Sequence, residues 1–259
     1  MEINFFEEYP SEKSLALATQ IPFPTKLYIR SANIEHFLQA SEFLKKCTNV
    51  HTAIFWPALS KKSGYWISPF ADTTELSSLF DSILNAHRSQ KIFEVMFDLE
   101  YPLNKLILFQ IVRNFKCFST NKKLIESFFE KASKSGIKII AIEKSHIPLS
   151  LLVFSGLMYK KYNHRISMYY SSFFRFFLPE KLADRLIRKK MKRAAKSGES
   201  FAIGLIAPGV YKHESTYSPK ILEKELRFAK ELGVREIIIY RLGGMNDQYF
   251  SVLNKFASK

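Results

Sequence analysis

The stretch Phe93-Glu94-Val95-Met96-Phe97-Asp98-Leu99-Glu100 decides which fold this sequence predicts. Successive side chains of a strand point to opposite faces, so one face of this stretch is wholly apolar, while the other carries the carboxylates of Glu94, Asp98 and Glu100. We expect the apolar face to lie against helices. The other face is expected to point into a closed barrel of strands, with Asp98 and Glu100 near its mouth.

Seven further runs along the chain are similar, because each is rich in Ile, Val, Phe or Tyr and is followed by a segment long enough for a helix. The predicted strands are 2–7, 25–32, 50–59, 91–101, 138–146, 164–172, 199–210 and 235–242, and the clearest helices are 33–47, 74–87, 179–197 and 218–232. Capping residues precede three of these helices, namely Asn33, Thr73 or Thr74, and Ser218 with Pro219. The long connection 104–136 is expected to hold two helices, the second at 122–135.

This alternation of eight strands with helices in 259 residues predicts a single (β/α)8 TIM barrel, spanning residues 1–259 as one domain. A doubly wound open sheet is the alternative, although it usually has fewer strands at this length. The sequence has no Gly-x-Gly-x-x-Gly after a strand and no Gly-x-x-x-x-Gly-Lys. We therefore expect neither a nucleotide-binding loop nor a cofactor.

The composition is that of a folded, water-soluble protein. Hydrophobic residues make up 47% and charged residues 24% of the chain, which excludes wholesale disorder. The apolar stretch 147–158 is too short for a membrane span and is expected to be a buried helix. The first residues are unlike a signal peptide, so a cytoplasmic location is expected. Cys47 and Cys117 are expected to be reduced, and no zinc-type ligand spacing predicts a metal site.

Asp98 and Glu100 are the first candidates for chemistry. Two residues apart on one face of a strand, their Cα atoms lie about 6.6 Å from each other. Two carboxylates this close do not both ionise freely, so one of them is expected to hold a proton and serve as a proton donor. The alternative is a structural ion pair with an inward-pointing base such as Arg241 or Lys212.

Two short motifs resemble those of the chitinase-like glycoside hydrolases. Asp98-x-Glu100 is similar to the tail of the family's Asp-x-x-Asp-x-Asp-x-Glu signature, and Met168-Tyr169-Tyr170 is similar to its Met-x-Tyr-Asp segment. The resemblance implies substrate-assisted, retaining hydrolysis of a glycan. By that resemblance Glu100 is the general acid/base, Asp98 orients the N-acetyl group of the substrate, and Tyr170 hydrogen-bonds it.

The sequence departs from that family at several motif positions. Phe93 and Met96 stand at the two earlier aspartates of the signature, and Ser171 follows the tyrosine in place of aspartate. Tyr240-Arg241 replaces the tryptophan that ends the last strand, and the third strand lacks Ser-x-Gly-Gly. A remote relative and a degenerate, sugar-binding homologue are therefore both left open.

Other side chains at the predicted carboxyl ends of the strands fit a sugar site. Aromatic rings pack on the C–H faces of sugars, and charged groups bind their hydroxyls. Of the neighbours Glu7 and Glu8, only one can point into the barrel, and Glu7 is the candidate. We expect substrate contacts from Glu7, Arg30, Trp56, Trp66, Glu143, Tyr169, Tyr240 and Arg241. The alternative is packing for the aromatic residues and a structural ion pair for the charged ones.

A strongly basic helix is the last notable feature. The chain has 39 Lys and Arg against 24 Asp and Glu, a net charge of +15 that favours anionic partners. Much of the excess lies in Arg185, Arg188, Lys189, Lys190, Lys192, Arg193 and Lys196. A solvated helix face accounts for this run, and so does a patch for phosphate, nucleic acid or an anionic membrane.

Three functions follow, from different classes. The first is a carbohydrate-active barrel that hydrolyses or binds a glycan or oligosaccharide, with Glu100, Asp98 and Tyr170 at its site. The second is a non-catalytic barrel that binds an anionic surface or partner through helix 185–196. The third, a metal-dependent phosphoryl or acyl hydrolase, needs acids and histidines to converge in space, which no spacing in the sequence indicates.

Overall fold

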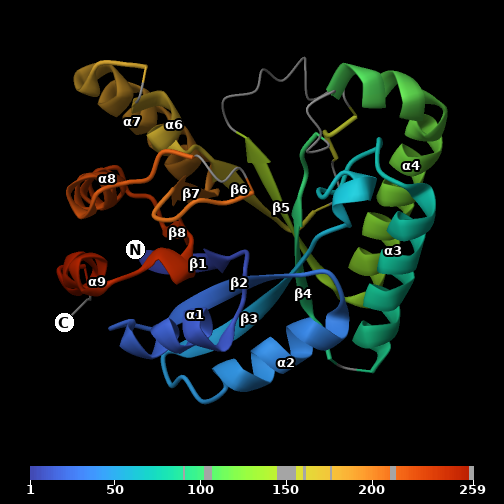
Figure 1. Cartoon of the computed structure of the whole chain (residues 1–259), viewed down its shortest axis with the longest axis horizontal. Coiled ribbons are helices and arrows are strands. Elements are labelled where there is room, and N and C mark those ends of the chain that lie inside the picture. The colour runs from blue at the N-terminus through green and yellow to red at the C-terminus, as the bar shows by residue number, and fades with distance from the viewer. Residues whose placement is uncertain are drawn as a thin grey trace. The chain divides into compact units, whose positions relative to one another are not determined.

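Strands and helices alternate along most of the described chain (Figure 1). The computed structural model describes residues 1–89, 91–101, 107–144, 156–159, 162–175, 177–210 and 214–256, with the backbone only for 107–116. The strands are β1 (Glu2–Glu7), β2 (Thr25–Ser31), β3 (Val50–Pro57), β4 (Glu94–Asp98), β5 (Lys138–Lys144), β6 (His164–Met168), β7 (Ser200–Gly204) and β8 (Glu236–Tyr240). The α-helices are α1 (Glu12–Ala16), α2 (Ile34–Leu44), α3 (Thr73–Arg88), α4 (Ile107–Ser135), α6 (Ser171–Arg175), α7 (Glu180–Ser197), α8 (Pro219–Glu231) and α9 (Asp247–Asn254). Short 3-10 turns lie at η1 (Leu17–Gln20), η2 (Lys61–Ser63) and η3 (Leu242–Gly244).

The eight strands follow one another in chain order and close into a barrel, which confirms the predicted (β/α)8 fold. Closure is made by β8, which pairs in parallel with β1 so that Phe6 lies beside Tyr240. The strands β4 and β5 are also parallel, with Glu94 beside Lys138 and Asp98 beside Ile142. All strands therefore direct their carboxyl ends to the same side of the sheet, which is where barrels of this type carry their functional residues.

The chain comprises two compact units. The first unit contains Met1–Arg30, Gln39–Ile54 and Ile166–Lys259, and the second contains Ser31–Leu38 and Phe55–Arg165. In the first unit α7 packs beside α8, and α8 beside α9; in the second unit α3 packs beside α4 (Figure 1). The expectation of one domain over residues 1–259 stays a prediction.

The two faces of β4 differ as its sequence predicts. The ring of Phe97 lies 6.2 Å from that of Phe80 on α3, and 5.7 and 5.4 Å from those of Phe128 and Phe129 on α4. Phe97 is fully buried in this aromatic cluster. The odd-numbered face of the strand therefore lies against the helices, and Asp98 belongs to the opposite face.

Most helix ends carry the expected signals, with one correction. The Asn33 side chain accepts a hydrogen bond from the His36 amide at 2.9 Å, and Ser218 caps α8 ahead of a proline. For α3, however, the cap is Asp72 rather than Thr73 or Thr74, and it accepts from the Glu75 amide at 2.9 Å. The helix begins earlier because a carboxylate there satisfies free amides and also complements the helix dipole.

The connection 104–136 was expected to hold two helices, and this is wrong. A single helix of 29 residues, α4, covers most of it, because no Gly or Pro interrupts residues 107–135. The buried helix expected at 147–158 lies outside the described residues, apart from 156–158, which are not helical. Among the helices that the structure describes, none is long and apolar enough to cross a membrane.

Candidate functional site

In the second unit, Asp98 and Glu100 lie at the carboxyl end of β4 and are deeply buried, with exposed fractions of 6% and 5%. Backbone hydrogen bonds hold the segment on both sides. The Asp98 carbonyl accepts from the Ile67 amide at 3.2 Å, and the Leu99 amide donates to the Ile142 carbonyl at 3.4 Å. The loop after β3 and the strand β5 therefore fix where the two carboxylates lie.

Glu100 forms an ion pair with Lys144, the last residue of β5. The Lys144 ammonium also lies 5.4 Å from the centre of the Trp66 ring, a cation–π contact. The sequence suggested Arg241 or Lys212 as a structural partner, but Arg241 pairs with Glu7, and Lys212 lies outside the described residues. Lys144 was missed, although its position beside Glu143 at a strand end is a signal that sequence reasoning can use.

Glu143 is also held in an ion pair. One of its carboxylate oxygens lies 2.6 Å from Nη2 of Arg165, and the other accepts a hydrogen bond from the Tyr162 hydroxyl at 3.3 Å. The side chain is 6% exposed. A substrate hydroxyl can therefore reach this carboxylate only by replacing one of these partners.

The two tryptophans are covered by protein. Trp56 is 4% and Trp66 8% exposed, and the Tyr65 ring meets Trp66 edge-on at 5.5 Å. Tyr65 adopts the left-handed conformation, with φ of 72°. The loop that carries these rings is tied down by Asn121, whose amide donates to two loop carbonyls at 3.0 and 2.7 Å. The sugar-stacking role of Trp56 and Trp66 stays a prediction.

In the first unit, Tyr240 at the end of β8 donates a hydrogen bond to the carboxylate of Glu8, which is 1% exposed. Burial, together with the charge of Glu8, raises the pKa of Tyr240 far above its usual value. The Tyr240 ring lies 5.5 Å from that of Tyr170 and 6.3 Å from that of Phe6. Tyr240 and Tyr170, both predicted as site residues, are therefore neighbours.

Glu7 occupies a different environment from the one expected. It accepts hydrogen bonds from the amides of Tyr9, at 2.9 Å, and Gly243, and it pairs with Arg241 at 3.2 Å. Burial raises the pKa of Glu7, and the Arg241 guanidinium opposes that rise. Glu8, not Glu7, shares a sheet face with Phe6 and Tyr240, because side chains alternate along β1.

The two remaining predicted residues also lie in the first unit. The Tyr169 ring stacks on Phe174 at 4.9 Å, with an angle of 4° between the ring planes, and it is 3% exposed. This contact is typical of core packing. Arg30 lies at the end of β2, and its charge acts on Tyr9: burial and the charge of Glu8 raise the pKa of Tyr9 to about 12, while Arg30 and Arg241 oppose the rise.

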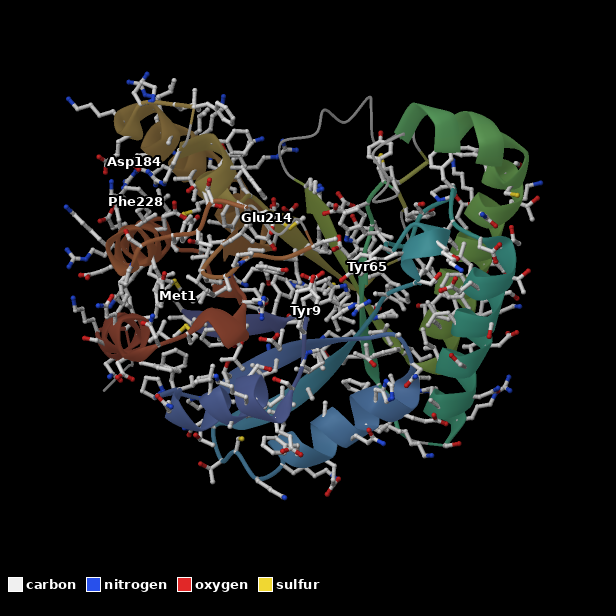
Figure 2. All side chains as sticks on the ribbon, viewed as in Figure 1. Met1, Tyr9, Tyr65, Asp184, Glu214 and Phe228 are labelled. Carbon is white, nitrogen blue, oxygen red and sulfur yellow. The ribbon has the colours of Figure 1, made fainter. Side chains whose placement is uncertain are left out.

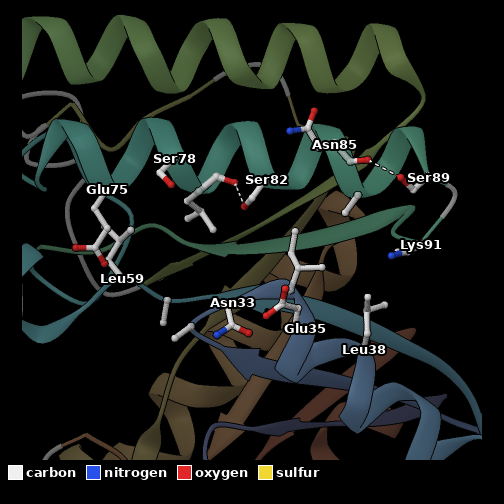
Figure 3. A pocket seen from close by; sticks show the side chains of 15 residues that line it. Asn33, Glu35, Leu38, Leu59, Glu75, Ser78, Ser82, Asn85, Ser89 and Lys91 are labelled. Carbon is white, nitrogen blue, oxygen red and sulfur yellow. Dashed lines mark hydrogen bonds between the residues drawn. The ribbon is translucent and has the colours of Figure 1, made fainter.

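A separate groove of about 550 Å³ runs between α2 and α3 in the second unit (Figure 3). Polar side chains such as Asn33, Glu75, Ser82 and Asn85 line it together with Leu59. None of the predicted site residues lines this groove. Among the described residues, no group of three His, Cys, Asp or Glu side chains is placed to hold a metal ion.

The closed ring of parallel strands, with buried carboxylates at strand carboxyl ends, places the chain in the structural class of (β/α)8 barrels. Among solved structures, it is similar to a class V chitinase from Nicotiana tobaccum in complex with NAG4, with a TM-score of 0.58 and 9% identity, covering 100% of this chain and 99% of that one. It is also similar to the chitinase-like agglutinin RobpsCRA from Robinia pseudoacacia, with a TM-score of 0.54 and 13% identity over 98% and 99% of the two chains.

A third solved structure of the same fold is an AP endonuclease, family 2, from Brucella melitensis, with a TM-score of 0.53 and 14% identity over 99% and 97% of the chains. No protein-family model matches the sequence, and no curated protein sequence matches it. The resemblance to chitinase-like barrels is thus confirmed at the level of the fold. Identities this low show the fold alone.

Proposed function

We propose that this protein is a carbohydrate-active barrel that hydrolyses or binds a glycan at the carboxyl end of β4. The observation that carries the proposal is the pair Asp98 and Glu100, which are buried close together where such barrels hold their chemistry. Two of the structural neighbours are named a chitinase and a chitinase-like agglutinin, which supports both the hydrolysing and the binding form.

In the hydrolysing form, Glu100 protonates the glycosidic oxygen as the bond to the leaving sugar breaks. The carbonyl oxygen of the substrate's N-acetyl group attacks the anomeric carbon, and water then opens the cyclic intermediate with Glu100 acting as base. Asp98 orients the amide. The role that the family resemblance implies for Tyr170, which belongs to the first unit, stays a prediction.

The ion pair with Lys144 sets a requirement for this chemistry. While Lys144 holds Glu100, the carboxylate accepts and does not donate a proton. Lys144 is 30% exposed, so its ammonium has room to turn towards water when a sugar enters.

The test is reducing-end release from N-acetylated and neutral oligosaccharides. Glu100→Gln is expected to lose more than about 100-fold in turnover, as expected for removal of a general acid. Glu94→Gln is the matched control, since Glu94 lies on the same strand and also pairs with a β5 lysine, but at the opposite end. Equal turnover in the wild type and Glu100→Gln would reject the catalytic assignment.

Binding without turnover has its own readout. The chain has two tryptophans, Trp56 and Trp66, both in the second unit, so intrinsic fluorescence reports on this region. A saturable fluorescence change with a chitin oligosaccharide, in the absence of product, supports the binding form. If no glycan of the panel gives turnover or a fluorescence change, the proposal as a whole is rejected.

A second function is favoured by one observation on α7, namely that several of its basic side chains face outward. Lys189, Lys192, Arg193 and Lys196 are exposed and form no ion pair among the described residues. This fits a barrel that binds an anionic surface or partner through residues 185–196. Steep weakening of binding with added salt is the expected signature, and salt-insensitive binding would contradict it.

A further inference from the structure

Two large apolar side chains are exposed beside the basic helix. Phe177, just before α7, is 79% exposed, and Leu182, in the first turns of α7, is 41% exposed. Both belong to the first unit, as does the whole of α7. We call these two residues, together with the outward-pointing basic residues of the helix, the α7 face; it consists of Phe177, Leu182, Arg185, Lys189, Lys192, Arg193 and Lys196.

Helical geometry places the helical members of the α7 face on one stripe. At 3.6 residues per turn, Leu182, Arg185, Lys189, Lys192, Arg193 and Lys196 fall within an arc of about 100°. The buried residues of the helix, Ala183, Ile187, Met191 and Ala194, lie on the opposite side. Because that apolar stripe is buried in the protein, it fixes the rotation of α7 about its own axis. The basic stripe therefore points towards solvent.

Asp184, an acidic residue of α7, forms its hydrogen bonds and ion pairs on another flank of the helix, which lies against α8. Asp184, which Figure 2 labels, accepts hydrogen bonds from Lys224 and Arg175, at 2.9 and 2.8 Å. Arg188 stacks on Phe228 at 4.5 Å and pairs with Glu231 at 2.9 Å. The charge of this flank is therefore balanced within the protein.

On the α7 face itself the positive charges stand close together without such balance. Arg185, Lys189, Lys192, Arg193 and Lys196 form no ion pair within the described part of the chain. Next to the α7 face, burial, together with the charges of Arg193 and Lys189, lowers the pKa of Lys190. Positive charges that repel one another are stabilised when an anionic partner binds to them.

We propose that the α7 face docks the protein on a lipid bilayer that is rich in anionic headgroups. The proposal rests on the second function above and names its partner. Arg185, Lys189, Lys192 and Lys196 contact headgroup phosphates and carboxylates, while Phe177 and Leu182 enter the boundary between headgroups and acyl chains. A nucleic acid would engage the same charges but would leave both apolar side chains in water, so the observations favour the bilayer.

The test is co-sedimentation of the full chain with vesicles of phosphatidylcholine alone, or of equal parts phosphatidylcholine and phosphatidylserine. We expect binding to the mixed vesicles only. Lys189→Gln with Lys192→Gln and Lys196→Gln is expected to weaken it about 100-fold, at roughly fivefold per charge. The control variant, Lys123→Gln with Lys131→Gln and Lys134→Gln on α4, has the same net charge and is expected to bind as the wild type does.

The apolar side chains separate the bilayer from other anionic partners. Phe177→Ser with Leu182→Ser is expected to weaken vesicle binding at least tenfold at both low and raised salt, and to leave binding to a short DNA duplex unchanged. Phe93→Ser, which removes another exposed apolar residue, is the control. Because these variants leave Asp98 and Glu100 intact, oligosaccharide turnover or binding should stay at its wild-type level.

Three results would overturn the docking proposal. Binding to the DNA duplex but not to vesicles would retain an anionic partner and reject the bilayer. Equal binding to neutral and mixed vesicles would reject the electrostatic contribution of α7. If the α7 and α4 lysine variants weaken vesicle binding equally, then net charge, and not the α7 face, attracts the membrane.

Discussion

Glu100 and Lys144 form an ion pair at the carboxyl ends of β4 and β5, and Glu94 and Lys138 form an equivalent pair at the amino ends of the same strands. One register produces both, since Glu94 lies beside Lys138 and the second pair follows at the same spacing along each strand. The pairs differ in burial. The glutamate side chain is 5% exposed in the first pair and 29% in the second.

This difference predicts unequal costs when the lysine is removed. Lys144→Met leaves a buried carboxylate without its cation, which we expect to lower the free energy of unfolding by about 1–3 kcal/mol after allowance for the partly exposed lysine. Lys138→Met is expected to cost at most about 1 kcal/mol. Urea denaturation at neutral pH measures both, and equal costs would contradict the inferred role of burial.

The same pair can be examined in a double-variant cycle. Glu100→Gln removes the charge that Lys144→Met leaves unpaired, so the double variant is expected to be more stable than Lys144→Met alone. A coupling free energy of about 1 kcal/mol or more is expected for groups in direct contact. Additive costs would show that the ion pair contributes nothing to stability.

Phe97 and Phe93 lie on the same face of the β4 segment but differ in burial, and their truncation should differ accordingly. Phe97→Ala empties the centre of the aromatic cluster formed with Phe80, Phe128 and Phe129 and is expected to cost about 3–5 kcal/mol. Phe93→Ala, at a site 56% exposed, is expected to cost no more than about 1 kcal/mol. Thermal unfolding distinguishes them, and similar losses would contradict the inward position of Phe97.

The Tyr240 hydroxyl lies so close to Gly209 that position 209 has no room for a side chain. A Cβ at position 209 would lie 2.3 Å from that hydroxyl and 3.0 Å from Oε2 of Glu214. Gly209→Ala is expected to displace Tyr240 from Glu8 at a cost of about 1–3 kcal/mol. In a Tyr240→Phe background the cost should fall, because the colliding atom is gone, and an undiminished cost would point to a different cause.

The Asp184 carboxyl is expected to contribute to the free energy of unfolding in a pH-dependent way. Partial burial would raise its pKa, but hydrogen bonds from Lys224 and Arg175 outweigh that and lower it. A carboxyl whose pKa is lower in the folded state stabilises the fold above its unfolded pKa, and this contribution is lost as the pH falls through the folded pKa.

We therefore expect Asp184→Asn to cost about 1–2 kcal/mol at pH 7, as for a hydrogen bond to a charged group, and less in acid. Urea midpoints check this when they are measured from neutral pH down to below the pKa of an unperturbed aspartate, which is about 3.9. A loss that stays constant across that range would indicate that the charge of Asp184 is not what matters.

The barrel could be predicted from the amino-acid sequence, because the periodicity of Ile, Val, Phe and Tyr is a local property of each strand. The sequence also placed Asp98 and Glu100 on the face of β4 opposite to Phe97, since alternation along a strand depends only on position in the chain. The start of α8 was predictable for the same reason. The cap of α8, Ser218 with Pro219, is read from adjacent residues.

Which side chain each of these residues contacts, by contrast, could be seen only in the folded chain. Lys144 forms an ion pair with Glu100, and Arg241 forms one with Glu7. Tyr240 donates its hydrogen bond to Glu8 and not to Glu7. Each of these pairs joins residues far apart in the chain. Strand register and closure of β8 onto β1 fix such pairs, and neither is encoded within a single segment. Periodicity shows which way a side chain points, but only the pairing of strands brings its partner within reach.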